Sequence, residues 1–516
     1  MDNGSDAQLL SACEMFERRL SSDPDAVFIV TPDGVERSYA DVARVAEALS
    51  GVLRGHAVGH GDIVGLYLWN DPAWVVAMFA TWWLGAAIAA CGALAPPSEA
   101  ARRFGVVSPR VIVVADDLEA PSGWDTVRVS AEGKSVASAT APGAVAKANS
   151  ALDDVAAIFF TSGTTGEAKP IVHYHRRIAE GPRNTAGAYS RSAEFRPRVA
   201  PANKAPAVSF SPFGHVAGMG RMVFRMFVGR PLLLVPKFDV AVLQSLAARY
   251  PLDTLQLTPA MVYSLAFTDA EIDLGSLKYV NSGTAPLPAA TREVFERRYR
   301  VPVLQAYGST EGGVTALESY EDALAGRRGP GSVGRVPPGT SIRIVDATGA
   351  DAAHGEEGEI LGRPEHAANR HYLTSIGEAP LPVDSGGWYH TGDVGRLDAE
   401  GILYVTGRLK DMMIVGGFNV YPGEVEDALR RSDLVRDAVV VAVPDDRLGE
   451  VPVAGIVWET PTQETILEDR VTRLAHQVRD HLEAYKLPRR WTTLEALPLT
   501  PNGKLDRRRA AEMLRG

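Results

Sequence analysis

The sequence has little cysteine, with only Cys13 and Cys91 among its 516 residues. These two form neither a disulfide framework nor the paired spacing of a metal or redox site, so a reducing cytoplasm is the expected compartment. Long basic tracts are also lacking, and the net charge is −10, which argues against nucleic acid or an anionic membrane as the main partner. The first residues are acidic and no apolar segment follows them closely, so no secretion signal is expected.

Long apolar runs are lacking too, except for residues 74–95, which make 22 residues without a charge. That length could span a bilayer. However, Gly85 and Gly92 interrupt the run, alanine dominates it, and no basic flank sets an orientation. The pattern therefore predicts a buried helix over residues 74–84, a break at Gly85 and then a buried strand, with no membrane partner.

What remains is ordinary for a soluble globular protein, with 46% hydrophobic and 22% charged residues. Apolar strands alternate with amphipathic helices through the first 400 residues, which predicts an α/β domain over residues 1–409, built of parallel or mixed sheets covered by helices. After Gly392 the pattern changes to a hairpin with its turn at residues 398–401, followed by helices over 422–431 and 462–482. This predicts a small, mobile α+β domain over residues 410–516.

The most informative motif is Phe-Thr-Ser-Gly-Thr-Thr-Gly-Glu-Ala-Lys-Pro, at residues 160–170. It follows an apolar run that predicts a buried strand, and its two glycines allow the backbone to turn sharply and approach an anion. Hydroxyls, loop amides and a lysine suit phosphate binding. The spacing is not that of a Walker loop, and a solvated turn is the alternative interpretation. The candidate phosphate ligands are Ser162, Thr164, Thr165 and Lys169.

Four further loops suggest a nucleotide site. Residues 281–288 are small enough for close packing against a planar ligand, and residues 305–311 offer an aromatic face, a hydroxyl and a carboxylate ligand for a divalent cation. Residues 389–411 contain a carboxylate on a glycine turn, suited to sugar hydroxyls, and a guanidinium. A Pro/Gly loop near the end contains one lysine. Taken singly, the carboxylate could be a turn residue, the guanidinium part of a surface ion pair and the lysine a solvated side chain. Five such loops in one chain favour a nucleotide-binding site.

The order and spacing of these loops, from about Tyr39 to Arg507, resemble the adenylate-forming superfamily of acyl- and aryl-CoA ligases, luciferases and peptide-synthetase adenylation domains. The resemblance implies that a carboxylate attacks the α-phosphate of ATP to give acyl-AMP, and that a thiol then displaces AMP. It also implies these roles: Ser162, Thr164, Thr165 and Lys169 hold the β/γ-phosphates; Gly283, Thr284, Ala285, Pro286 and Tyr307 enclose adenine; Thr310 contacts the α-phosphate; Glu311 holds Mg²⁺; Asp393 and Arg408 bind ribose; Lys504 bridges carboxylate and nucleotide oxygens.

The resemblance further implies that the small domain swings about a hinge at Lys410 between the two steps. Gly416 and Gly417 would then let the pantetheine arm of CoA pass close to the backbone. An exposed linker residue is the alternative interpretation of Lys410.

Residues 213–218 resemble the substrate-pocket loop of the acyl- and aryl-CoA ligases, with His215 at the carboxylate end; a packing histidine is the alternative. No aspartate lies between residues 209 and 220, which disfavours an α-amino acid. Ala217, Gly218 and Met219 suggest an apolar pocket for a fatty, alicyclic or aromatic acid. The chain ends twelve residues after Lys504, so we expect an external acceptor: CoA first, a free carrier protein second.

One departure concerns residues 168–170, which read Ala-Lys-Pro where the family has Pro-Lys-Gly. Proline removes an N–H and excludes the preceding residue from the helical region. Losing one charge-assisted hydrogen bond costs roughly 1.5–3 kcal/mol, about 10- to 150-fold in rate. Two alternatives follow: an enzyme that mainly thioesterifies acyl-AMP supplied by a second ligase, and a non-catalytic acyl- or nucleotide-binding protein. Retention of Glu311, Asp393, Arg408 and Lys504 argues against the second.

Overall fold

A computed structural model describes most of the chain, and it divides the chain into two units. Unit 1 comprises residues 1–257, 269–280 and 365–382, and unit 2 comprises 258–268, 281–364 and 383–516. The functional boundary between residues 409 and 410 stays a prediction. The described residues are 9–130, 147, 150–161, 169–180, 205–309, 313–329, 331–336, 340–363, 370–374, 377–380, 383–460, 467–479, 481–499 and 505–515.

Unit 1 contains an eight-stranded sheet in the order β19-β18-β8-β7-β4-β3-β5-β6. The strands from β7 to β6 pair in parallel, as the alternation of strands and helices predicts, whereas β8, β18 and β19 pair antiparallel. The sheet is therefore mixed. Its strands are β3 (Ile63–Leu68), β4 (Ala87–Gly92), β5 (Val111–Ala115), β6 (Thr126–Val129), β7 (Val155–Thr161), β8 (Lys169–Tyr174), β18 (Arg370–Thr374) and β19 (Gly377–Pro380).

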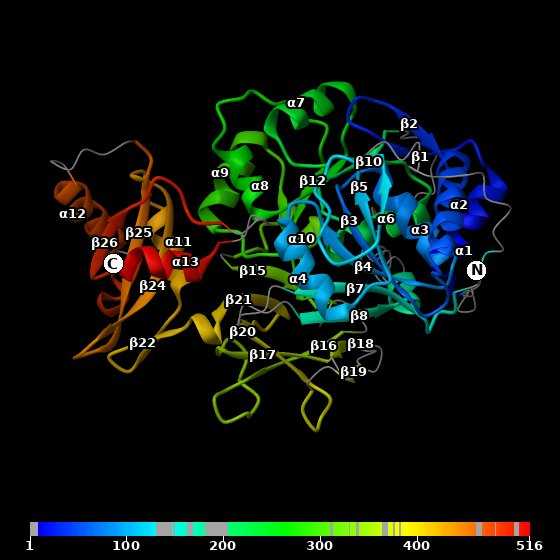
Figure 1. The fold of residues 1–516 in the computed structure, drawn as a ribbon. Helices are drawn as coiled ribbons and strands as arrows, with labels where there is room; N and C mark the ends of the chain where they lie inside the picture. Colours follow the sequence, from blue (N-terminus) through cyan, green and yellow to red (C-terminus); the bar gives the residue numbers. More distant parts are fainter. Residues whose placement is uncertain are drawn as a thin grey trace, which may run out of the picture. The chain divides into compact units, whose positions relative to one another are not determined.

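Helices cover both faces of this sheet, because successive side chains of a strand point to opposite sides. Leu66 of β3 packs in the cluster that holds α2 and α3, and its neighbour Tyr67 packs in the cluster that holds α4 (Figure 1). Ser38 begins α2 with a reciprocal capping box. The helices of unit 1 are α1 (Ala12–Ser22), α2 (Tyr39–Gly55), α3 (Pro72–Trp82), α4 (Pro97–Val107), α6 (Val216–Val228) and α7 (Val240–Arg249).

A smaller sheet in unit 1 has the order β2-β1-β10-β9. Parallel pairs join β1 to β10 and β10 to β9, and β2 forms an antiparallel edge. Its strands are β1 (Val27–Val30), β2 (Glu36–Ser38), β9 (Ala207–Ser209) and β10 (Leu232–Leu234); β11 (Thr254–Leu257) and β12 (Tyr279–Ser282) follow along the chain.

The uncharged run is buried from residue 74 to residue 91, as predicted, whereas Leu94 near its end is exposed. Every residue of α3 is buried, and its N-terminus is capped by the Asp71 side chain, which accepts a hydrogen bond from the Ala73 N–H. Gly85 makes the break at a φ of +73°, a conformation that favours glycine, and β4 follows it. Within the described part of the chain, no helix combines the length and apolarity that a membrane span requires.

His175, directly after β8, makes the stability of unit 1 depend on pH. It is 1% exposed, its ring meets that of Trp82 edge-on at 5.0 Å, and burial lowers its pKa from 6.5 to about 4. Between these pH values the unfolded chain binds a proton that the folded chain does not, so stability falls as the pH drops through this window. The loss has an upper bound of about 3 kcal/mol.

We therefore expect His175→Phe to flatten the decline in stability between pH 6.5 and pH 4, since phenylalanine keeps a ring against Trp82 and has no proton to bind. Urea unfolding followed by tryptophan fluorescence at pH 7, 5.5 and 4.5 measures the effect. Equal pH slopes in the variant and the parent chain would show that His175 does not carry this dependence.

Unit 2 begins with a sheet whose successive strands, β13-β14-β15-β21-β20-β17-β16, all pair antiparallel. Parallel or mixed sheets were expected through the first 400 residues, and these strands supply antiparallel pairs; β20 and β21, for example, are neighbours along the chain and pair antiparallel. The hairpin with its turn at residues 398–401 is confirmed as β20 and β21. The strands are β13 (Val303–Ser309), β14 (Gly313–Leu317), β15 (Ser332–Arg335), β16 (Ser341–Val345), β17 (Gly358–Arg363), β20 (Tyr389–Leu397) and β21 (Ile402–Arg408), with helices α8 (Pro259–Ala266), α9 (Ala289–Tyr299) and α10 (Tyr320–Leu324).

The C-terminal part of unit 2 is an α+β structure, as predicted. Its sheet has the order β23-β22-β25-β24, with β26 parallel to β25. The predicted helix over residues 462–482 ends at Val478, four residues earlier than expected, and its described part is α12. The elements are β22 (Met413–Val415), β23 (Phe418–Val420), α11 (Pro422–Arg430), β24 (Val435–Asp445), β25 (Gly449–Trp458), α12 (Leu467–Val478), β26 (Arg490–Thr493) and α13 (Arg507–Arg515).

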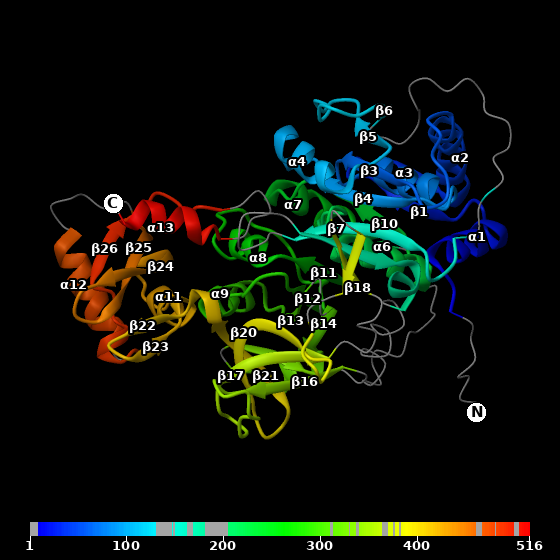
Figure 2. The same ribbon diagram turned by 60° about the horizontal axis from the view of Figure 1, so that its bottom comes forward.

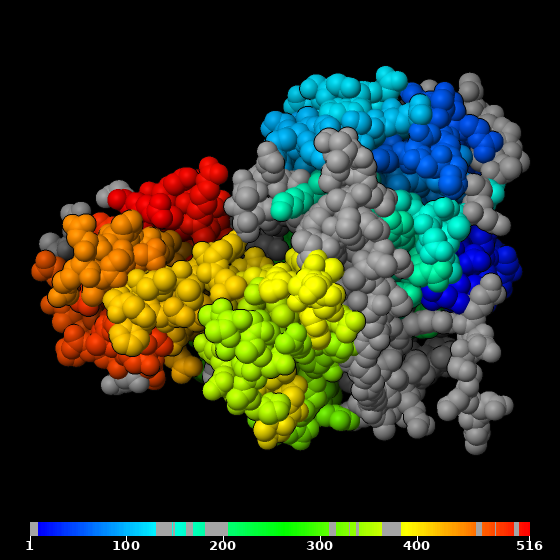
Figure 3. Space-filling model, turned by 90° about the horizontal axis from the view of Figure 1, so that it is seen from below, coloured from blue at the N-terminus to red at the C-terminus, as the bar shows by residue number. Residues whose placement is uncertain are grey.

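Strand β24 separates two apolar clusters in this part. Ala438 and Val440 face α11 and α12, whereas Val439 and Val441 face α13, following the period of two. Figure 2 shows α11 and α13 on opposite sides of β24. The outer side of α13, in red, lies at the surface of this part (Figure 3).

Candidate active site

Unit 2 brings three of the predicted nucleotide-binding side chains into direct contact. Asp393 on β20 lies opposite Arg408 on β21 in the strand register. The Arg408 Nε donates to Asp393 Oδ1 at 2.5 Å, and the Tyr307 hydroxyl, from β13, donates to Oδ2 at 2.7 Å. The carboxylate is nearly buried, and the hydroxyl of Thr391 accepts the Asp393 N–H at 3.0 Å. Tyr307, from the motif at residues 305–311, and Asp393 and Arg408, from residues 389–411, thus form one cluster, the Tyr307 cluster.

The geometry leaves the Asp393 carboxylate with acceptor capacity. An ionised carboxylate offers about four lone-pair positions on two oxygens. Among the described residues, one side-chain donor reaches each oxygen. A free acceptor position on each oxygen suits two adjacent hydroxyls, as on a ribose ring.

The electrostatics keep Tyr307 a donor and Arg408 a cation. Burial, and next the charge of Asp393, raise the pKa of the Tyr307 hydroxyl far above its usual range. Burial by itself would lower the pKa of Arg408, but the hydrogen bond and charge of Asp393 outweigh it and raise that pKa. Tyr307 therefore stays protonated and Arg408 stays charged across the physiological pH range.

The small-residue loop, Gly283, Thr284, Ala285 and Pro286, lies against β13, the strand that carries Tyr307. A Cβ at Gly283 would lie 3.0 Å from the Ala306 carbonyl oxygen, so only glycine allows this approach without a shift. Thr284 has a φ of +74°, a left-handed conformation rare for a residue with a branched side chain. Thr284 and Pro286 are exposed. This strained, tightly placed backbone next to Tyr307 agrees with a flat binding surface.

The predicted hinge and pantetheine residues lie directly after the cluster. Lys410 is exposed in the short 3₁₀ turn Leu409–Asp411. Partial burial lowers the pKa of Lys410, against the opposing charge of Asp411. Gly416 and Gly417 form the turn between β22 and β23 with φ of +58° and +91°, so both positions require a left-handed backbone.

In unit 1, the structure explains the backbone at the unusual phosphate-loop ending. Lys169 is the first residue of β8 and pairs with Thr161, and the buried Pro170 pairs with Phe160. Lys169 is extended, as a residue before proline is expected to be, and its side chain is exposed. The loop thus joins two antiparallel strands, whereas a Walker loop joins a strand to a helix.

His215 is the N-cap residue of α6 and is half-buried. The turn before it is tight, since a Cβ at Gly218 would lie 2.3 Å from the Pro212 carbonyl oxygen. The structure also shows a residue that sequence reasoning missed: Arg221, one turn further along α6, is nearly buried and hydrogen-bonded to Gln256. Arg221 and Arg225 are the two charges inside the otherwise apolar run of α6, and that was the available signal.

Several predicted site residues lie outside the described residues, and their roles stay predictions: Ser162, Thr164, Thr165, Thr310, Glu311 and Lys504. The Mg²⁺ prediction depends on Glu311. Within the described ranges, no group of three or more His, Cys, Asp or Glu side chains could hold a metal ion.

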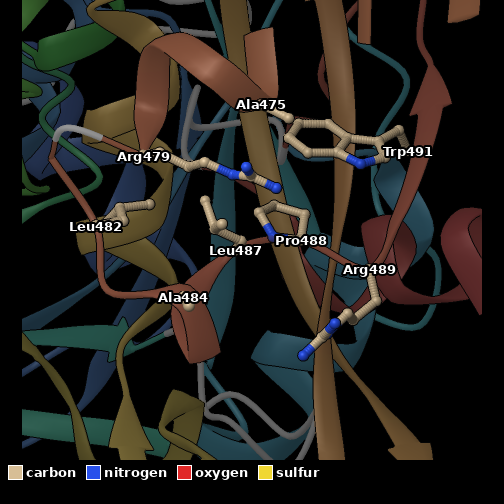
Figure 4. A pocket seen from close by; sticks show the side chains of 8 residues that line it. All are labelled: Ala475, Arg479, Leu482, Ala484, Leu487, Pro488, Arg489 and Trp491. Atoms are coloured by element: carbon tan, nitrogen blue, oxygen red, sulfur yellow. The ribbon is translucent and has the colours of Figure 1, made fainter. Parts of the chain in front are cut away.

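A cavity of about 520 Å³ in the C-terminal part was not predicted from any motif. It lies beside the end of α12, and Figure 4 shows the Arg479 side chain extending across it toward Pro488. The lining residues are Ala475, Arg479, Leu482, Ala484, Leu487, Pro488, Arg489 and Trp491.

Comparison with known proteins decides the family. A model described as "AMP-binding enzyme" matches residues 16–372, and one described as "AMP-binding enzyme C-terminal domain" matches residues 424–504. The chain belongs to the AMP-binding, adenylate-forming family. The resemblance inferred from the five loops is confirmed.

Relatives within this family are named as acid–CoA ligases. The chain is 29% identical over 508 residues to the long-chain-fatty-acid–CoA ligase FadD13 of Mycobacterium tuberculosis, covering 95% of this chain and 96% of that one. It is 30% identical over 503 residues to 4-coumarate–CoA ligase 3 of Oryza sativa subsp. japonica, covering 92% and 87%.

Solved structures confirm the predicted fold class of an α/β N-terminal part with mixed sheets and a small C-terminal part. ATP-bound MatB from Rhodopseudomonas palustris is 25% identical with a TM-score of 0.81, covering 98% of this chain and 99% of that chain. An anthranilate CoA ligase in complex with anthranoyl-AMP is 25% identical with a TM-score of 0.81, covering 99% of each.

Proposed function

We propose that this AMP-binding enzyme is an acyl-CoA ligase that activates a non-amino carboxylic acid as acyl-AMP and transfers the acyl group to CoA. The observation that carries the proposal is the buried Asp393 carboxylate, held between Tyr307 and Arg408 with one acceptor position left on each oxygen. That arrangement suits the ribose of a nucleotide, in a family whose relatives are named for fatty-acid and aryl-acid CoA ligation.

In the first step, two anions must meet, so cations and preorganised donors supply most of the catalysis. The phosphate loop, with Lys169, would grip the β/γ-phosphates, and Lys504 would bridge the acid and the nucleotide oxygens. Thr310 would contact the α-phosphate. Glu311 would hold Mg²⁺, whose charge would offset that of the phosphates. The Tyr307 cluster and the Gly283 loop would fix the nucleoside.

In the second step, rotation at Lys410 would replace Lys504 by the turn at Gly416 and Gly417. The requirement for glycine at both turn positions supports a close passage of the pantetheine arm. The acid would occupy the apolar region beside His215, where Met219 and Met222 are buried on α6. We propose a cytoplasmic location, with a fatty, alicyclic or aromatic acid and CoA as partners.

A second candidate function is thioesterification of acyl-AMP supplied by a second ligase, with weak adenylation. The observation that favours it is Pro170, which occupies a strand position without a backbone N–H directly after Lys169. Acyl transfer to a free carrier protein differs only in the acceptor thiol, and parallel assays with CoA and a carrier protein distinguish the two.

We expect Pro170→Ala to raise the rate of ATP–pyrophosphate exchange about tenfold, because alanine restores one N–H at the edge of the phosphate loop. Pro170→Gly should raise it similarly. Transfer of the acyl group from synthetic acyl-AMP to CoA should stay within about threefold of the parent rate. Unchanged exchange in both variants would show that another donor already compensates for Pro170.

A further inference from the structure

The C-terminal part of unit 2 contains a buried ion-pair network that the proposed chemistry does not use. Arg507, the first residue of α13, donates to both carboxylate oxygens of Glu426 on α11, from Nη1 at 2.6 Å and from Nη2 at 3.1 Å. The carboxylate of Glu426 is 5% exposed. A bidentate guanidinium–carboxylate pair fixes geometry as well as charge.

Both partners are also tied to one residue of β24, the edge strand of the sheet. The Val440 N–H donates to Glu426 Oε1 at 2.9 Å, and the Arg507 Nη1 donates to the Val440 carbonyl oxygen at 3.2 Å. Strand β24 runs between the two apolar clusters of this part, so it offers a rigid frame. The start of α13 is therefore fixed to α11 at the β24 edge of the sheet.

The same guanidinium reaches the predicted hinge. The Arg507 Nε lies 3.6 Å from Oδ2 of Asp411, the residue directly after Lys410. One side chain thus connects the hinge turn, helix α11 and the start of α13.

The segment before Arg507 is pinned at its base by backbone contacts. Leu499 and Leu505 form an antiparallel bridge, and the Asp506 N–H donates to the Pro498 carbonyl oxygen at 2.8 Å. Lys504 lies three residues before Arg507 in the sequence. The described contacts of Leu505, Asp506 and Arg507 therefore lie within three residues of the predicted adenylation lysine.

We propose that Arg507 is a positioning residue for the adenylation half-reaction: held by Glu426 and facing Asp411, it fixes the base of the Lys504 segment relative to the hinge. This inference rests on the proposed acyl-CoA ligase function. A shift of about 1 Å in a catalytic group can lower a rate by about 100-fold. The fork-shaped guanidinium of arginine fixes the position of its partners better than the point charge of lysine does.

The test compares Arg507→Lys with a matched control, Arg508→Lys, the next residue on α13. Arg508 is 85% exposed and pairs only with Glu512, at 3.2 Å among the described residues. We expect Arg507→Lys to lower the kcat of ATP–pyrophosphate exchange about 10- to 100-fold, with the KM for ATP within about threefold. CoA transfer from synthetic acyl-AMP should be unchanged, and Arg508→Lys should change neither step.

If Arg507 has only a structural role, Arg507→Lys should lower the rates of both half-reactions together or raise both KM values. Either result would overturn the proposal, and so would an unchanged rate of exchange. Glu426→Gln keeps the shape of the side chain and removes its charge, so it should reproduce the selective loss of exchange. It tests the same contact from the other side if Arg507→Lys fails to fold.

A second measurement does not depend on activity. Tryptic cleavage of the Lys504–Leu505 bond, followed by mass spectrometry, should be several-fold faster in Arg507→Lys than in Arg508→Lys. If the parent chain performs neither half-reaction, the proposed function is wrong. The cleavage rates then test by themselves whether Arg507 fixes the base of the Lys504 segment. Equal cleavage rates in the two variants would overturn the proposal that Arg507 fixes this segment.

Discussion

Replacing Asp393 with asparagine should lower kcat/KM for ATP by about 100-fold, since hydrogen bonds to a charged group contribute about 1.5–3 kcal/mol each. The amide loses the negative charge that pairs with Arg408 and one of the two oxygens that would accept the ribose hydroxyls. Initial rates of ATP–pyrophosphate exchange at varied ATP measure the effect.

The sharpest form of this experiment uses dATP beside ATP. If Asp393 binds the ribose hydroxyls, the parent enzyme should prefer ATP over dATP, and Asp393→Asn should lose most of that preference. Asp351→Asn is the matched control, because Asp351 pairs with Arg343 at 2.7 Å but is 68% exposed. An undiminished preference for ATP in Asp393→Asn would place the ribose elsewhere.

Replacing Lys504 with alanine should reduce adenylation about 1000-fold, the loss expected when a group that stabilises transition-state charge is removed. CoA transfer from synthetic acyl-AMP should remain within about threefold, because Lys504 would act only in the first step. Single-turnover assays of each half-reaction measure both rates. Lys278, an exposed lysine outside the proposed machinery, provides the control Lys278→Ala.

Equal losses in both half-reactions of Lys504→Ala would contradict the proposal that Lys504 acts in adenylation and the turn at Gly416 and Gly417 acts in CoA transfer. A loss confined to CoA transfer would reverse the assigned roles.

The sequence predicted those parts of the fold that local pattern determines. The β20–β21 hairpin follows from period-two alternation around a turn at residues 398–401. The uncharged run at residues 74–95 was placed in the core because glycines divide it into a helix and a strand. In each case the decisive signal lies within about twenty residues.

Pairing between distant segments was not predictable in the same way. The antiparallel pairing of the strands in unit 2 was not specified in advance, because alternation of apolar residues identifies a strand and not its partner. Tyr307 was expected to pack on adenine, and its hydroxyl contact with Asp393, 86 residues away, depends on the order of β13, β20 and β21 in the sheet.

The partners of the buried charges were likewise not predictable from the sequence. Glu426 and Arg507 are 81 residues apart, and charged side chains in an amphipathic helix are ordinarily assigned to its solvent face. Arg221 on α6 was missed for the same reason. The family's loops pointed to the site, whereas the contacts that hold it came only from the structure.

The most direct test of the central claim is a panel of fatty, alicyclic and aromatic acids assayed separately for ATP–pyrophosphate exchange and for CoA transfer from the matching synthetic acyl-AMP. The account predicts that at least one acid supports both half-reactions, with AMP and an acyl-CoA as final products. Transfer without exchange would support the second candidate function. The absence of both half-reactions, with AMP or an acid still bound in calorimetry, would contradict the account and favour a non-catalytic binding protein.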